Sequence, residues 1–174
     1  ADDPGYTGDG CPSGNDLPDE QAPPTTDPTA GRAHAEPTVD APSYQRIVVA
    51  CDAILLLEPV PFDEYRTMIT VDAVPLLDEV ADAILRSPGV RVRVEAHTDN
   101  VGGAAANLEL TQLQAEAVVA VLEELGVTAE FVARGMGEEL PIADNLTDEG
   151  RSENRRIEIH AESGAFACDE TGRF

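Results

Sequence analysis

Three polar segments of the chain carry residue types that could do chemistry. His97 and Asp99 lie in a loop that follows an alternating apolar segment. Asn107 lies at the start of a predicted helix, and three arginines lie around Asn154 within residues 151–156. In an open α/β sheet, ligands bind at loops beyond the carboxyl ends of the strands. The His97–Asp99 loop is therefore the first candidate for a binding site.

The spacing of His97 and Asp99 is open to several interpretations. Residues two apart on a strand share a face, so the pair could bind a metal ion or transfer a proton. No third ligand is marked nearby, however. A hydrogen-bonded structural histidine, with Asp99 capping the turn before Gly102, explains the same residues. The arginines of 151–156 could likewise serve only to offset an acidic surface. We therefore assign no metal ligands.

Sequence motifs of common enzyme classes are missing between residues 44 and 162. This segment contains no glycine-rich phosphate loop, no HExxH and no GxSxG. Because no nucleophile or metal set is assembled, we expect a binding protein rather than an enzyme, with no cofactor in this segment.

Strand and helix patterns alternate along the segment that would position these loops. Apolar, alternating runs predict strands at 47–57 (one strand or a strand pair), 90–96, 131–134 and 155–161. Helical periodicity predicts one helix from about residue 71 to 87, a second that ends at Gly126, and a short third after Thr147. This βαβαβ(α)β order predicts an α+β fold, a small mixed four-stranded sheet with helices packed on one face.

The composition changes sharply near residue 43. Residues 1–43 hold eight of the thirteen prolines, nine acidic residues and one arginine. Such a segment cannot bury enough apolar surface to offset the entropy lost on ordering. We therefore expect a disordered acidic, Pro-rich segment at 1–43, a folded domain at 44–162 and a short tail at 163–174.

The charge of the whole chain excludes several classes of partner. Thirty-four acidic residues stand against eleven basic ones, all arginine, for a net charge of −23. Binding to nucleic acid or to an anionic membrane surface needs clustered cations, so neither is expected. No apolar run approaches the roughly 18–20 residues that cross a bilayer, so no transmembrane segment is expected.

The three cysteines, Cys11, Cys51 and Cys168, lie far apart and form no CxxC pair. They allow one disulfide with one thiol left over, or three unpaired thiols. Cys51 and Cys168 flank the part of the chain that looks folded, so a disulfide between them would join the C-terminal tail to the domain.

A series of motifs recurs in order along the predicted domain: HTD at 97–99, NLELT at 107–111, GMGE at 135–138 and GRSENRR at 150–156. Together they resemble the OmpA-like C-terminal domain over roughly residues 47–160. The resemblance implies non-covalent binding of peptidoglycan at the periplasmic face of the outer membrane, anchoring the membrane or an envelope complex to the cell wall. A location outside the cytoplasm also favours the Cys51–Cys168 disulfide.

The ligand implied by the resemblance is the diaminopimelate of the peptidoglycan stem peptide. Its side chain ends in an ammonium and a carboxylate, so the site needs an anionic acceptor beside a cationic or polar donor. In the family, an aspartate of the strand-end loop binds the ammonium, and Asp99 stands at that position. The other candidate ligand-binding residues are Thr98, Asn107, Gln114, Arg151 and Arg155.

The family's helix arginine, which binds the carboxylate, is replaced here by Gln114. Glutamine can donate a hydrogen bond but carries no charge and no planar guanidinium. Losing a charge-assisted pair costs about 1.5–3 kcal/mol, roughly tenfold to a hundredfold in affinity. Binding could therefore be weak, the ligand could be an amidated stem peptide, or Arg151 or Arg155 could carry the charge. The alternative function is an envelope protein–protein interaction domain that has kept the fold but weakened or lost peptidoglycan binding.

Residues 8–12, with the sequence GDGCP, resemble one degenerate copy of the calcium-binding thrombospondin type 3 repeats that precede such domains in some outer-membrane proteins. This resemblance would place calcium in the N-terminal segment.

Overall fold

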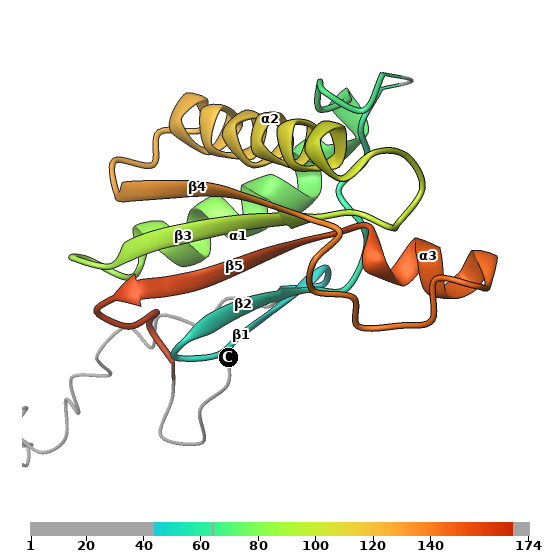
Figure 1. Ribbon diagram of the computed structural model, residues 1–174. Coiled ribbons are helices and arrows are strands. Elements are labelled where there is room, and N and C mark those ends of the chain that lie inside the picture. The colour runs from blue at the N-terminus through green and yellow to red at the C-terminus, as the bar shows by residue number, and fades with distance from the viewer. Residues whose placement is uncertain (1–43, 64, 169–174) are drawn as a thin grey trace, which may run out of the picture. The chain divides into compact units, whose positions relative to one another are not determined.

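The computed structural model describes residues 44–63 and 65–168. The expected disorder of residues 1–43, the calcium segment and Cys11 lie outside these residues. The described part contains strands and helices in the order β1 (Ile47–Val49), β2 (Ala53–Leu56), the 3₁₀ turn η1 (Val71–Ala73), α1 (Val74–Leu85), β3 (Arg91–His97), α2 (Ala104–Glu124), β4 (Glu130–Gly137), α3 (Asp148–Asn154) and β5 (Arg156–Ser163) (Figure 1).

The strands form one mixed sheet in the order β1-β2-β5-β3-β4. Only β3 and β4 pair in parallel, and the other neighbours are antiparallel. The predicted α+β class is confirmed, but the sheet has five strands rather than four. The extra strand arises because the chain reverses inside residues 47–57, where the Ala50 N–H donates to the Ala53 carbonyl at 2.8 Å. The expected strand is therefore the hairpin of β1 and β2.

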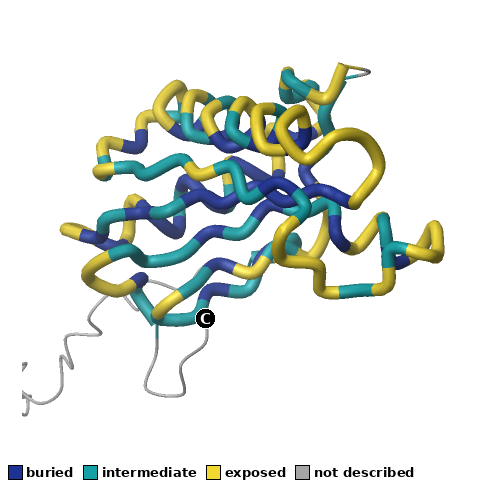
Figure 2. Tube along the Cα trace, in the orientation of Figure 1, coloured by how far each residue is buried: buried dark blue, intermediate teal, exposed yellow. Residues whose placement is uncertain are grey.

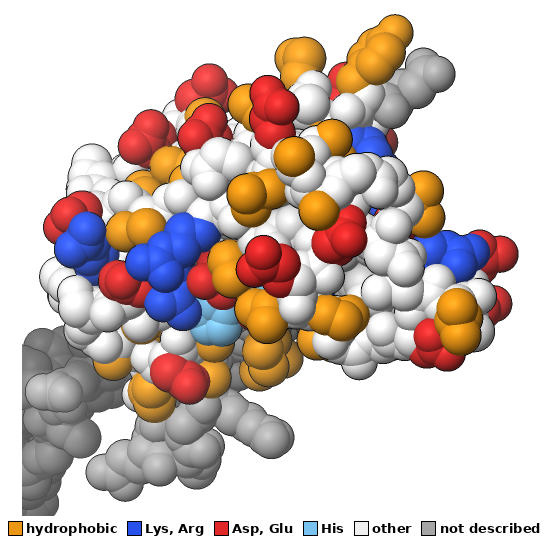
Figure 3. All heavy atoms as spheres, viewed as in Figure 1, with side chains coloured by type: hydrophobic (Ala, Val, Ile, Leu, Met, Phe, Trp, Pro, Cys, Tyr) orange, Lys and Arg blue, Asp and Glu red, His pale blue; other side chains and the backbone are white. Residues whose placement is uncertain are grey.

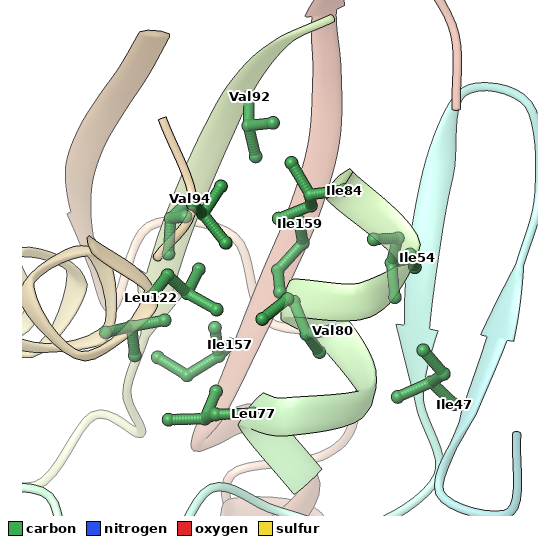
Figure 4. Packing of buried hydrophobic residues seen from close by; sticks show 14 of the residues in the cluster. Ile47, Ile54, Leu77, Val80, Ile84, Val92, Val94, Leu122, Ile157 and Ile159 are labelled. Atoms are coloured by element: carbon green, nitrogen blue, oxygen red, sulfur yellow. The ribbon is translucent and has the colours of Figure 1, made fainter. Parts of the chain in front are cut away.

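The hydrophobic core lies between the sheet and the helices α1 and α2 (Figures 1 and 2). Alternate residues of the central strands, such as Val94 in β3 and Ile159 in β5, point toward Leu77 in α1 and Leu122 in α2 (Figure 4). Each fully buried Val, Leu or Ile contributes roughly 1.5–3 kcal/mol. The opposite alternation places charged residues on the other face, so the sheet is amphipathic.

Two glycines determine where α2 ends and how closely it packs on the sheet. Gly126 ends the helix with a φ of +90°, a conformation that glycine adopts without strain. Gly135 lies where β4 passes beneath α2, and a Cβ there would collide with the backbone of Gln112. The Gln112 side chain instead accepts the Gly135 N–H at 2.8 Å. The Gly135-Met136-Gly137 motif therefore lets helix and strand approach closely.

The end of the sheet at the start of β3 is closed by a disulfide between Cys51 and Cys168, whose Cα atoms are 5.3 Å apart. Phe166 is buried beside it, and its N–H donates to the Cys51 carbonyl at 3.0 Å. The Ala167 N–H donates to the Ser87 hydroxyl at 2.8 Å. The ordered domain thus extends past residue 162, and residues 163–168 are packed on it. Among the described residues, no helix has the length and apolarity needed to cross a membrane.

Candidate ligand-binding site

A hollow of about 350 Å³ opens at the opposite end of the sheet, where β3 ends and β5 begins. It is lined by residues from three parts of the chain: Pro59, Val60, Phe62, Asp63 and Arg66; His97, Thr98 and Gln114; and Ser152, Arg155, Arg156 and Ile157. Three of the six residues predicted to bind the ligand, Thr98, Gln114 and Arg155, are among them.

Asp99 lies just behind this wall and is only 4% exposed. Its two carboxylate oxygens have separate partners: the Val101 N–H donates to Oδ1 at 3.0 Å, and Arg155 Nη1 donates to Oδ2 at 2.6 Å. Asp99 is therefore connected to the hollow through Arg155, whose side chain is 34% exposed and lines it.

Asp99 is held in its ionised form. Burial by itself would raise the pKa of this carboxyl group, but the hydrogen bonds from Arg155 and the Val101 amide act in the opposite direction. The positive charges of Arg155 and Arg66 add to them, so the pKa of Asp99 lies below its ordinary value. The site thus offers a fixed negative charge beside two arginines.

Gln114 lines the hollow, and its side-chain amide has a hydrogen-bond partner there. Its Nε2 donates to the backbone carbonyl of Arg66 at 2.9 Å, which joins α2 to the loop that precedes η1. Arg66 has a φ of +61° and is the one non-glycine residue with positive φ in the described part. A non-glycine residue in this conformation is uncommon and must be held there by its surroundings.

The loop around Arg66 is the part of the site that the sequence analysis missed. Asp63 Oδ1 accepts the N–H groups of Thr67 and Met68 at 3.0 and 3.1 Å, and the Arg66 N–H donates to the Asp63 carbonyl at 2.9 Å. These contacts present the Arg66 side chain at the hollow, where Phe62 also lies. An aspartate that caps a turn before an arginine is a sequence signal for such a loop, but it does not show which site the loop faces.

Asn107 and Arg151 lie outside the lining of the hollow. Asn107 is buried, and its Nδ2 donates to the Asp99 carbonyl at 3.3 Å and to Glu138 Oε2 at 2.5 Å, so it supports the strand-end loop from behind. Arg151, in α3, donates to the Asn145 carbonyl at 2.8 Å and pairs with Asp148. Arg155 and Arg156, and not Arg151, are therefore the arginines of this motif that line the hollow.

His97 and Asp99 have different partners. His97 Nε2 lies 3.9 Å from Glu158 Oε1, whereas Asp99 pairs with Arg155. Burial, and then the charge of Arg156, lower the pKa of His97 below its usual value, so its imidazole is neutral at neutral pH. The arrangement does not bring the two residues together on one ligand.

Comparisons with known proteins agree with the fold and the motifs. A model of the OmpA family matches residues 62–155. The outer-membrane lipoprotein YfiB of Pseudomonas aeruginosa is 45% identical over 84 residues, which are 48% of this chain and 50% of YfiB. The peptidoglycan-binding protein ArfA of Mycobacterium tuberculosis is 40% identical over 85 residues, 48% of this chain and 26% of ArfA. The chain thus spans half or less of the length of these curated relatives.

A solved structure of the cell wall anchor of the T6SS from Pseudomonas aeruginosa superimposes with a TM-score of 0.57 and 30% identity, over 67% of this chain and 87% of that one. The peptidoglycan-associated lipoprotein from Burkholderia pseudomallei gives a TM-score of 0.52 with 28% identity, over 66% and 88% of the two chains.

Proposed function

Because the chain belongs to the OmpA family, we propose that it binds peptidoglycan non-covalently and holds a component of the bacterial envelope to the cell wall from the periplasmic side. The observation that carries this proposal is the hollow beside the Asp99–Arg155 pair. The relatives named for peptidoglycan or cell-wall binding support the same function. We therefore propose a binding role rather than a catalytic one.

The proposed ligand group is the zwitterionic end of diaminopimelate. Its ammonium replaces Arg155 Nη1 as a partner of the Asp99 carboxylate, and the released Arg155 binds the ligand carboxylate. One internal ion pair is thereby exchanged for two pairs with the ligand, so no charge is left buried without a partner.

Arg66 contributes the positive charge that Gln114 lacks. Its side chain lines the same hollow, and its charge already acts on Asp99. In this chain, Gln114 is a positioning residue, since its amide holds the Arg66 backbone at 2.9 Å. The positive charge that the family places on the helix corresponding to α2 thus comes, in this chain, from the loop before η1.

Co-sedimentation with purified sacculi tests the proposal. Asp99→Asn keeps the shape of the side chain but removes its charge, and we expect binding to fall at least about tenfold. Asp72→Asn, exposed in η1, is the matched control and should bind as the unmodified chain does. Sacculi whose stem peptides carry lysine in place of diaminopimelate lack the carboxylate at the end of that side chain. The unmodified chain should therefore bind them weakly. Equal binding of all three chains to both kinds of sacculi would contradict the proposal.

A second candidate function, docking of another envelope protein, is favoured by apolar side chains on the same loop. Tyr65, Met68 and Val71 are 79, 68 and 79% exposed. If the unmodified chain does not sediment with sacculi, and cross-linking to an envelope protein is lost in Tyr65→Ser/Met68→Ser, this second function replaces the first.

A further inference from the structure

The face of the sheet that α1 and α2 leave uncovered carries a ladder of charged and imidazole side chains. In Figure 3, arginines, acidic residues and a histidine gather on this face. The antiparallel register of β3 and β5 sets Glu95 directly opposite Glu158, Arg93 opposite His160 and His97 opposite Arg156. Two like charges directly opposite each other destabilise a sheet unless a positive group lies between them.

The two carboxylates are oriented in the same way. Each gives one oxygen to an arginine: Arg93 Nε lies 3.0 Å from Glu95 Oε1, and Arg156 Nε lies 2.6 Å from Glu158 Oε1. Each turns its other oxygen toward His160, whose Nε2 lies 3.8 Å from Glu95 Oε2 and 3.0 Å from Glu158 Oε2. The hydrogen bond from Arg156 therefore orients Glu158 as outer groups orient metal ligands, whereas Arg93 contributes its charge beside Glu95.

The spacing of these three groups suits a small divalent ion. One donor atom from each of Glu95, Glu158 and His160 lies within 4.8 Å of the others. Ligand atoms about 2.0–2.2 Å from a tetrahedral zinc ion are roughly 3.3–3.6 Å apart. The distances of 3.0 and 3.8 Å from His160 bracket that separation.

His97 provides an independent indication of a missing partner. Its side chain is 2% exposed, and neither ring nitrogen has a hydrogen-bond partner. Its Nε2 lies 3.9 Å from Glu158 Oε1, the oxygen that pairs with Arg156, so the ring adjoins the cluster through Glu158. A buried imidazole without any partner is rare, and an ion is one of the few groups that would satisfy it.

We infer that Glu95, Glu158 and His160 form a site for a divalent transition-metal ion of the zinc type, with the buried His97 beside it. An imidazole donor together with two carboxylates favours such ions over calcium or magnesium. The ion would join β3 to β5 across the uncovered face and offset the facing glutamates. This inference does not depend on peptidoglycan binding.

Titration of the full chain with Zn²⁺, in physiological salt and excess Ca²⁺, tests the site. Calorimetry should show one tight equivalent, and bound Co²⁺ should show the visible absorption of a low-coordinate site. Glu158→Gln and His160→Ala should each weaken the tight site at least about tenfold. Glu162→Gln is the matched control, because it lies on the same face of β5 and pairs with Arg93 at 2.6 Å but is outside the cluster.

The thermal midpoint gives a second readout that separates lost binding from lost folding. Zn²⁺ should raise the midpoint of the unmodified chain and of Glu162→Gln but not that of Glu158→Gln. Weak binding that all variants share, or tight binding that survives both substitutions in the cluster, would overturn the inference.

Discussion

The two ends of the sheet are stabilised in different ways. At the end where β3 begins, a disulfide, the buried Phe166 and backbone hydrogen bonds join segments far apart in the sequence. At the end where β3 finishes, a buried ion pair and polar side chains surround a hollow. Covalent and apolar contacts stabilise the fold at the first end, whereas the second holds paired charges whose partners we propose are exchanged for a ligand.

Asp99 is almost completely buried at the second end of the sheet. Ionised groups are costly to bury unless they are paired, and Asp99 is paired with Arg155 and the Val101 amide. The contacts that join distant segments at the first end are instead the disulfide, Phe166 and backbone hydrogen bonds. The two ends should therefore respond differently to mutation. Mutations at the disulfide should change mainly stability, and mutations at the hollow should change mainly binding.

The largest expected effect is on stability, at the end of the sheet that carries the Cys51–Cys168 disulfide. Cys51→Ser/Cys168→Ser removes a link that spans 117 residues and should lower the free energy of unfolding by about 2–4 kcal/mol. Denaturant unfolding measures this change, and the unmodified chain unfolded with and without reductant is the control. Sacculus binding by the folded variant should be unchanged at 25 °C. A parallel loss of affinity would show that the two ends are not separable.

The next largest effect is on binding, at the end of the sheet that carries the hollow. Arg66→Gln should weaken sacculus binding about tenfold, because it removes a charge that faces the ligand, and should leave the thermal midpoint unchanged. Arg86→Gln, exposed on α1 and paired with Asp82, is the control.

Gln114→Arg tests the same contrast by restoring the family's arginine. If Arg66 already carries the positive charge, this substitution should improve binding little in the unmodified chain but recover most of the loss in Arg66→Gln. A double-mutant cycle measures the coupling between the two positions. Additive effects would mean that Arg66 does not take the place of the missing arginine.

The smallest effect concerns acid stability. The pKa of Asp99 is lowered by Arg155 and the Val101 amide, so its contribution to stability is present above the unfolded value of about 3.9 and is lost as the pH falls through the folded value. The stability difference between the unmodified chain and Asp99→Asn should therefore shrink on acidification. Urea unfolding at several pH values measures it, and a constant difference would contradict the assignment.

The elements that sequence periodicity could predict are those that local contacts decide. The β3 strand and the helices α1 and α2 follow from apolar patterns and from Gly126, because each pattern reports directly on one buried face. The hairpin of β1 and β2 is ambiguous in the sequence, since its turn at residues 50–52 carries no glycine or proline.

The site was predictable only where its residues belong to recognisable motifs. Thr98 and Arg155, which belong to the predicted motifs, line the hollow, but Arg66 could not be assigned because its position depends on a contact with Gln114, 48 residues away. Similarly, Glu95 has no partner for a metal site nearby in the sequence, and only the pairing of β3 with β5 brings Glu158 and His160 to it. Long-range pairing, and not local pattern, determines these sites.

The most direct test of the central claim is a crystal structure of the chain with a stem peptide that contains diaminopimelate. We expect the ligand ammonium within hydrogen-bond distance of Asp99 and the ligand carboxylate between Arg155 and Arg66, with the Asp99–Arg155 pair opened. A peptide bound elsewhere, with that ion pair still closed, would contradict it.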